Sequence, residues 1–295
     1  MENLGNDKLV LYAIPLFLFM VGLEAWISTR RQRGWYQRED AFASLSMGVG
    51  NVVISGALKA FWLGLFVWLY QYRVFDLDLH SAWVWVGGLF LQDFCFYWYH
   101  RSSHRIRLLW AAHENHHSSR FFNFTTALRQ SWTTPLYSAS FFLPMALLGF
   151  HPLMILTYQA ISLIYQFFLH TDSVDRLGPI EWVMNTPSHH RVHHGRNPEY
   201  IDCNYAGIFI IWDRLFGSFV PEKARVDFGL VGEHPSYNPL HIAVHHFVLI
   251  ARDLRQARSS GDVLGILFRG PEWWKARQLA GPMPAAAANP PVGPV

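Results

Sequence analysis

The sequence contains few of the residues that define disulfide scaffolds, iron–sulfur proteins and nucleic-acid-binding proteins. Only two of its 295 residues are cysteines, Cys95 and Cys203, and they do not form a CxxC pair. Neither a disulfide framework nor a protein-held iron–sulfur cluster is therefore expected. Charged residues make up 15% of the chain, against roughly a quarter in an ordinary soluble domain. The formal net charge is only +3, without a long lysine or arginine run, so nucleic acid is not an expected partner.

Apolar and aromatic residues are abundant instead. They account for 51% and 16% of the chain, and the mean hydropathy is positive. Apolar runs at residues 9–27, 49–70 and 83–99 come close to the roughly 20 residues that a membrane-spanning helix needs. Two shorter runs, 135–150 and 152–169, flank a Gly-Phe-His-Pro turn and predict a tilted or re-entrant hairpin. We therefore expect an all-α integral membrane protein with four to five transmembrane or re-entrant helices.

Basic residues predict how this multi-pass protein is oriented. Arginines follow the first and the third apolar run: Arg30, Arg31, Arg33 and Arg38, then Arg101, Arg105 and Arg107. Excess lysine and arginine beside a span marks the cytoplasmic side. The histidines described next follow the third run and the hairpin, so we expect them to form a cytoplasmic histidine-rich cap.

Nine of the sixteen histidines form spaced clusters between residues 100 and 194. They are an HxxxH box (His100, His104), an HxxHH box (His113, His116, His117), a lone His170, and a second HxxHH box (His190, His193, His194). Residues three or four apart share a helix face, so each box is expected to direct its imidazoles toward one place. Imidazole suits iron, zinc, copper and nickel, and nine ligands are too many for one ion and about right for two. The pattern predicts a histidine-rich dinuclear site, with iron as the metal if the chemistry uses oxygen.

His170 and the histidines outside the nine are assigned by their surroundings. His170 ends an apolar helix, where it can cap the last turn or bind metal, and we favour metal binding. His189 points about 100° away from His190 on a helix and is left out of the site. The fourth grouping (His241, His245, His246) falls in an amphipathic stretch at residues 238–258, where a solvated face is expected.

Asp93 lies seven residues before the first box, on the same helical face. A carboxylate inside an apolar run is costly and usually functional. We expect Asp93 to act in the second shell by accepting a hydrogen bond from the far nitrogen of a metal-binding histidine, which would fix its tautomer. Pairing with Lys59 across helices is the alternative.

Two other functions share parts of this pattern. His113 to His117 also reads as HExxH, in which two histidines hold zinc and the glutamate, here Glu114, is the general base of a metalloprotease. That interpretation leaves most of the histidines unexplained. A histidine-rich metal transporter is a second alternative, but it predicts polar residues throughout the spans, which are nearly apolar.

The three boxes, in this order, resemble those of the fatty acid hydroxylase/sterol desaturase superfamily. The resemblance covers roughly residues 85–220. Four flanking segments, 123–131, 185–197, 204–207 and 212–217, are similar to its alkylglycerol monooxygenase-like branch.

This resemblance implies a non-haem di-iron centre with two Fe ions, O2 as oxidant, and a membrane lipid substrate (sterol, fatty acyl or ether lipid) that is hydroxylated or desaturated. The chain has no Rossmann fingerprint and no haem or iron–sulfur motif, so an external electron donor is needed: a ferredoxin, a b-type cytochrome or a reduced pterin.

The chain is expected to divide into four parts. They are N-terminal transmembrane helices (1–80), a fatty acid hydroxylase-like catalytic domain (81–222), an amphipathic C-terminal surface region (223–280) and a disordered, proline- and alanine-rich tail (281–295).

Overall fold

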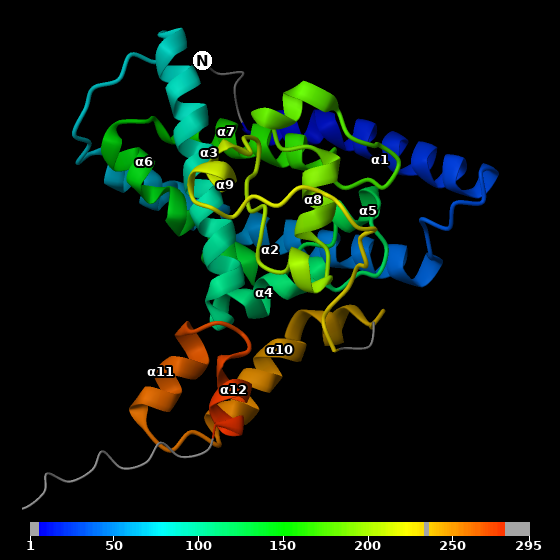
Figure 1. Ribbon diagram of the computed structural model, residues 1–295. Helices are drawn as coiled ribbons and strands as arrows, with labels where there is room; N and C mark the ends of the chain where they lie inside the picture. The colour runs from blue at the N-terminus through cyan, green and yellow to red at the C-terminus, as the bar shows by residue number, and fades with distance from the viewer. Residues whose placement is uncertain (1–5, 233–235, 281–295) are drawn as a thin grey trace, which may run out of the picture.

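The computed structural model describes residues 6–232 and 236–280 (Figure 1). The tail expected to be disordered, residues 281–295, lies outside the described residues. The described chain contains helices and two isolated β-bridges but no strand, so the all-α prediction is confirmed.

Twelve α-helices and four short 3-10 helices follow one another in the described part. The first half contains α1 (Asn6–Arg30), α2 (Arg38–Tyr70), α3 (Ala82–Arg105), α4 (Arg107–His117), α5 (Phe124–Ala127), η1 (Thr134–Leu136), η2 (Ser138–Phe142), α6 (Leu143–Leu148) and α7 (Pro152–Phe167). The second half contains η3 (Gly178–Trp182), α8 (Pro187–His193), η4 (Pro198–Tyr200), α9 (Ile211–Leu215), α10 (Pro239–Leu254), α11 (Ser260–Phe268) and α12 (Trp273–Leu279).

Two of the described helices are long and apolar enough to cross a membrane, namely Tyr12–Arg30 of α1 and Arg38–Tyr70 of α2. Only 17% of the most apolar stretch of α1 and 6% of that of α2 are buried inside the protein, so their apolar side chains face outward. At 33 residues, α2 is about 50 Å long, against about 30 Å for the hydrocarbon core of a bilayer. The helix is therefore longer than a single crossing requires. The predicted span at 83–99 lies inside α3, and its crossing of a membrane stays a prediction.

The turn predicted between the two shorter apolar runs is present, but the first run is not one helix. Residues 134–148 form η1, η2 and the six-residue α6, because Pro135 and Pro144 lack the N–H that a continuous helix uses. Gly149 then turns the chain with φ +106°, a conformation that other residues rarely adopt. α7 follows at once, with Pro152 in its first turn.

α3 connects the apolar half of the protein to the histidine region. It packs against α4, α7 and η2, and the largest apolar cluster joins it to α2, α6 and α7 through residues such as Phe66, Cys95, Met145 and Tyr158. This packing fixes the last two turns of α3, which carry the first histidine box.

The C-terminal helices α10, α11 and α12 lie together on one side of the molecule, drawn from gold to red in Figure 1. The amphipathic stretch at residues 238–258 contains α10. It packs on α4, and a buried ion pair of 2.6 Å joins Arg107 at the start of α4 to Asp253 on α10. Ala111, Ile250, Ile266 and Trp274 form the apolar cluster between these helices.

Candidate metal centre

The nine clustered histidines converge in space from four parts of the fold, and all nine are buried. They come from the end of α3 (His100, His104), from α4 (His113, His116, His117), from directly after α7 (His170), and from α8 and its C-cap (His190, His193, His194). Five of them, the five-histidine group, have ring nitrogens within 4.8 Å of one another: His100, His104, His113, His117 and His193. The other four meet the same criterion as the four-histidine group: His116, His170, His190 and His194.

Each HxxHH box contributes to both groups. On α4, His113 and His117 belong to the five-histidine group, whereas His116 belongs to the four-histidine group. The box on α8 has the opposite arrangement, with its first and third histidines in the four-histidine group and its middle one in the five-histidine group. The expectation that each box points at one place is therefore wrong. The first and last histidines of an HxxHH box are four residues apart and differ by only about 40° around a helix. The last two histidines are neighbours and differ by about 100°, so their rings point to different centres.

The two groups are adjacent. The rings of His117 and His194, one from each group, stack with their centroids 4.3 Å apart. Those of His116 and His117 are 5.6 Å apart. The arrangement is suited to two ions in neighbouring sites.

Backbone carbonyls determine which ring nitrogens of the four-histidine group are free. Nδ1 of His170 donates to the carbonyl of Gln166 at 2.7 Å, and Nδ1 of His116 donates to that of Arg129 at 3.3 Å. Since a carbonyl only accepts, both protons are on Nδ1 and both Nε2 atoms present a lone pair. These two Nε2 atoms lie 3.0 Å apart, where two lone pairs repel each other. A bound cation would turn this repulsion into coordination, so the residues fit a metal.

The five-histidine group has the same chemistry. Nδ1 of His100 donates to the carbonyl of Tyr205 at 2.7 Å, and Nδ1 of His193 donates to that of Cys203 at 2.8 Å. The lone pair on Nε2 of His100 faces Nε2 of His113 at 2.9 Å. Nε2 of His193 is buried and has no hydrogen-bond partner. An unsatisfied buried nitrogen is costly, and metal coordination would satisfy it.

Burial also keeps these imidazoles uncharged. Desolvation lowers the pKa of His170 to about 3 and that of His193 to about 4. The pKa values of the other seven are held well below the usual value, by burial first and by neighbouring imidazoles second. At neutral pH all nine are in the deprotonated state that binds metal.

Asp213 on α9 holds the loop that supplies the carbonyls to the five-histidine group. Its carboxylate accepts hydrogen bonds from the backbone N–H of Tyr205 and of Ala206, each at 2.8 Å, and from the hydroxyl of Ser218 at 2.7 Å. The backbone carbonyl of Tyr205 in turn accepts a hydrogen bond from the ring of His100. Asp213 therefore fixes the orientation of that ring through the backbone of Tyr205.

Asp93 is buried, but the expected hydrogen bond from a metal-binding histidine is wrong. One carboxylate oxygen accepts from the N–H of Ile208 at 2.7 Å, and the other accepts from the N–H of Phe209 at 2.8 Å and from the indole of Trp212 at 3.0 Å. Asp93 thus anchors the next part of the same loop to α3. At Asp93, the helical face that carries the first box packs against backbone N–H groups of this loop. The pattern of side chains in the sequence does not indicate such partners.

Glu114 points to α10, away from the position that a zinc-protease base needs. Its carboxylate accepts a hydrogen bond from Nδ1 of His246 at 2.6 Å and lies 3.7 Å from Nδ1 of His245. The expectation of a solvated fourth histidine group is therefore wrong for His246, which is buried. It is buried because α10 lays this face on α4, where Glu114 and Arg107 contact the ring.

The two isolated histidines are separated by the fold. His170 joins the four-histidine group, as the favoured interpretation requires. His189 belongs to neither group and lies 4.0 Å from the carboxylate of Glu181, in agreement with its exclusion.

The residues that hold the imidazoles in place were missed by sequence reasoning. Tyr205, Cys203, Arg129 and Gln166 act through backbone carbonyls, which every residue has. No side-chain pattern marks them.

Comparisons with known proteins agree with the site. Residues 85–218, which contain all nine histidines, match the family model Fatty acid hydroxylase. Alkylglycerol monooxygenase of Xenopus tropicalis is 39% identical over 270 residues, which cover 91% of this chain and 60% of the relative. The Homo sapiens enzyme of the same name is 36% identical over 273 residues, covering 91% and 61%. Ornithine lipid hydroxylase OlsE of Rhizobium tropici is 30% identical over 151 residues, covering 50% and 46%.

The chain thus spans about 60% of the length of the alkylglycerol monooxygenases that it matches. No solved structure matches it significantly.

Proposed function

Because residues 85–218 belong to the fatty acid hydroxylase family, we propose that this protein is a membrane-bound, monooxygenase-type oxidoreductase. It would use O2 and two iron ions to hydroxylate or desaturate a C–H bond of a lipid. The observation that supports this most directly is the pair of adjacent groups of buried, uncharged imidazoles. Nitrogen-only ligand sets of this kind suit iron.

Each histidine group would hold one iron ion. Bound iron would supply the redox chemistry with oxygen that no side chain of the chain provides. The protein's own contribution is to hold the rings, to keep them neutral and to exclude water. The electrons would come from a ferredoxin, a b-type cytochrome or a reduced pterin.

A membrane lipid is the proposed substrate. The relatives are named for alkylglycerols, ornithine lipid and cholesterol, so an ether lipid is the first candidate and fatty acyl and sterol lipids follow. The outward-facing apolar side chains of α1 and α2 support a multi-pass membrane location. We place the metal site on the cytoplasmic side from the arginines beside it.

The experiment combines metal analysis with product analysis. The protein is purified in detergent, its metals are counted by mass spectrometry, and it is incubated with 18O2, each class of reductant and a panel of ether, acyl and sterol lipids. We expect two irons per chain and either an 18O-labelled or a newly unsaturated lipid. The His104→Ala variant should hold fewer than two irons and should form neither lipid product. One zinc per chain and new peptide termini, abolished by Glu114→Gln, would show a metalloprotease instead.

A further inference from the structure

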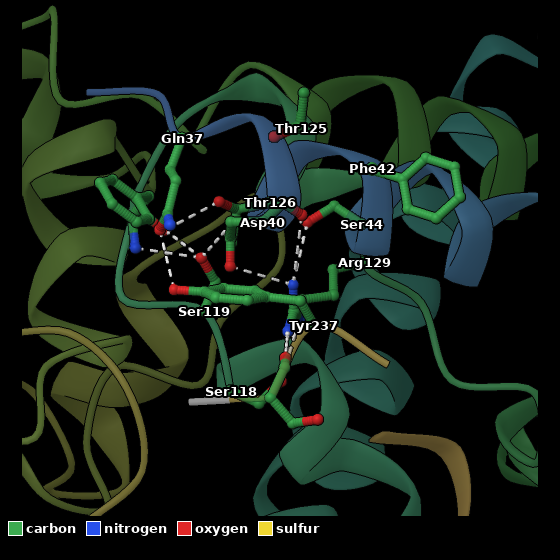
Figure 2. Close-up of polar contacts among 12 residues, drawn as sticks. Gln37, Asp40, Phe42, Ser44, Ser118, Ser119, Thr125, Thr126, Arg129 and Tyr237 are labelled. Atoms are coloured by element: carbon green, nitrogen blue, oxygen red, sulfur yellow. Dashed lines mark hydrogen bonds and ion pairs between the residues drawn. The ribbon is translucent and has the colours of Figure 1, made fainter. Parts of the chain in front are cut away.

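The four-histidine group is connected to α2 through Arg129, whose carbonyl accepts the proton of His116. The side chain of Arg129 is fully buried and lies between α2 and the end of α4 (Figure 2). Its guanidinium donates to the carboxylate of Asp40 and to the hydroxyl of Ser44, both at 3.2 Å. It also donates to the hydroxyl of Ser118 at 2.9 Å. The position of this carbonyl therefore depends on α2.

Asp40 also holds the segment that directly follows His117. Its second carboxylate oxygen accepts from the hydroxyl of Ser119 at 2.7 Å, as Figure 2 shows. One buried carboxylate in the first turn of α2 thus fixes both the end of α4 and the Arg129 carbonyl that orients His116.

A second buried carboxylate, Glu24 on α1, holds the other side of the same group. It accepts hydrogen bonds from the hydroxyl of Thr171, from the N–H of Phe124 at 2.9 Å and from the hydroxyl of Tyr36 at 2.5 Å. Thr171 directly follows His170, which is a member of the four-histidine group. Glu24 and Asp40 both lie before the segment that matches the family model.

From these contacts we propose that Asp40 and Glu24 are positioning residues that act mainly on the four-histidine group. This proposal rests on the proposed function, because it takes each histidine group to be a metal site. Through these residues the two membrane helices control the geometry of one ion of the pair. The five-histidine group takes its main backbone support from Asp93 and Asp213, within residues 85–218.

The expected effect is selective loss of one metal. Asp40→Asn leaves the buried guanidinium of Arg129 without its charge partner, which forces that side chain and its carbonyl to move. Changes to groups that orient a metal ligand typically lower metal affinity by about 10- to 100-fold. We expect a loss of this size at the four-histidine group and a smaller loss at the five-histidine group.

The test is a chelator-competition titration on the purified full chain, with Co2+ as a spectroscopic probe, at a chelator concentration that leaves the wild type with two ions. Asp40→Asn and Glu24→Gln are each expected to retain one ion, with the spectrum of His170→Ala rather than that of His104→Ala. The double variant Asp40→Asn/Arg129→Gln removes both charges of the pair and is expected to recover the second ion.

Asp253→Asn is the matched control, because it also breaks a buried pair with an arginine, and it should keep both ions. The proposal is overturned if Asp40→Asn keeps two ions or loses both, or if Asp253→Asn loses the same ion. If Asp40→Asn does not fold, the milder Ser44→Ala, which removes one hydrogen bond from the Arg129 guanidinium, decides by the same criterion. Failure of the proposed function has a different result, because it appears in the wild type as absent metal or absent lipid product.

Discussion

The two histidine groups have the same ligand type and adjoin each other, but different parts of the chain hold them. The five-histidine group depends on a loop after α8, whose backbone is fixed by Asp93 on α3 and Asp213 on α9. The four-histidine group is contacted by segments that Glu24 on α1 and Asp40 on α2 hold. One group is thus supported from within the family-matched segment and the other from the two long apolar helices α1 and α2.

This difference has a structural consequence. Both HxxHH boxes contribute to both groups, so neither group can shift without rotating α4 and α8 against the other. The supporting carboxylates bond to the segments that follow these helices and His170, at Ser119, Thr171 and Tyr205. We infer that the paired site needs both halves of the fold, although each half fixes only one group.

Removing both metals should have the largest effect. Treatment of the purified protein with a strong chelator should abolish lipid oxidation and lower the thermal midpoint by about 20 °C. Each ion present at about 1,000 times its Kd stabilises the folded state by about 4 kcal/mol, so two ions contribute about 8 kcal/mol, which corresponds to a shift of this order. Calorimetry before and after restoring iron measures the change. An unchanged midpoint would contradict bound metal in the native site.

Removing one group at a time should separate the two halves. His104→Ala and His170→Ala are each expected to retain one metal and to lose more than about 100-fold in lipid product, since losing a ligand costs more than disturbing a group that orients one. Metal counting with product analysis checks both. Full activity in either variant would mean that its group is not part of the reaction site.

Disturbing only the support of the five-histidine group should have a smaller effect. Asp213→Asn weakens the bonds to Tyr205 and Ala206, so metal affinity at this group should fall by about 10- to 100-fold. The four-histidine group should keep its ion. Titration against a chelator, with Asp253→Asn as the control, measures this. Loss at the four-histidine group instead would reverse the assignment of supports.

Glu114→Gln should change activity least. Glu114 bonds to His246 on α10 and does not face either group, so lipid oxidation should stay within about threefold of the wild type. The free energy of unfolding should fall by about 1–3 kcal/mol, because a buried charged hydrogen bond is weakened. A complete loss of activity would require Glu114 to act in the reaction.

Some of the site was predictable because it is encoded by side chains at helical spacing. The nine histidines, the exclusion of His189 and the choice of metal binding for His170 all follow from residue type and spacing. The division of each HxxHH box between two centres was within reach too, since it follows from 100° per residue. It was missed because each box was treated as one unit.

Other features depend on contacts between distant segments. Asp93 was recognised as unusual, but its partners are backbone N–H groups more than 110 residues away. His246 was assigned to a solvated face because its helix is amphipathic. Its burial follows only from the docking of α10 on Glu114 and Arg107.

By itself, the sequence determined that this chain is helical, that it contains apolar runs long enough for membrane helices, and that nine imidazoles were available for metal. Residue type and helical period are local properties, so they are visible without a fold. Only the tertiary structure decided which imidazoles share a centre and which carboxylates hold them. These relations depend on backbone carbonyls and N–H groups, which are identical in nearly every residue and acquire a role only when packing places them beside a ring or a carboxylate.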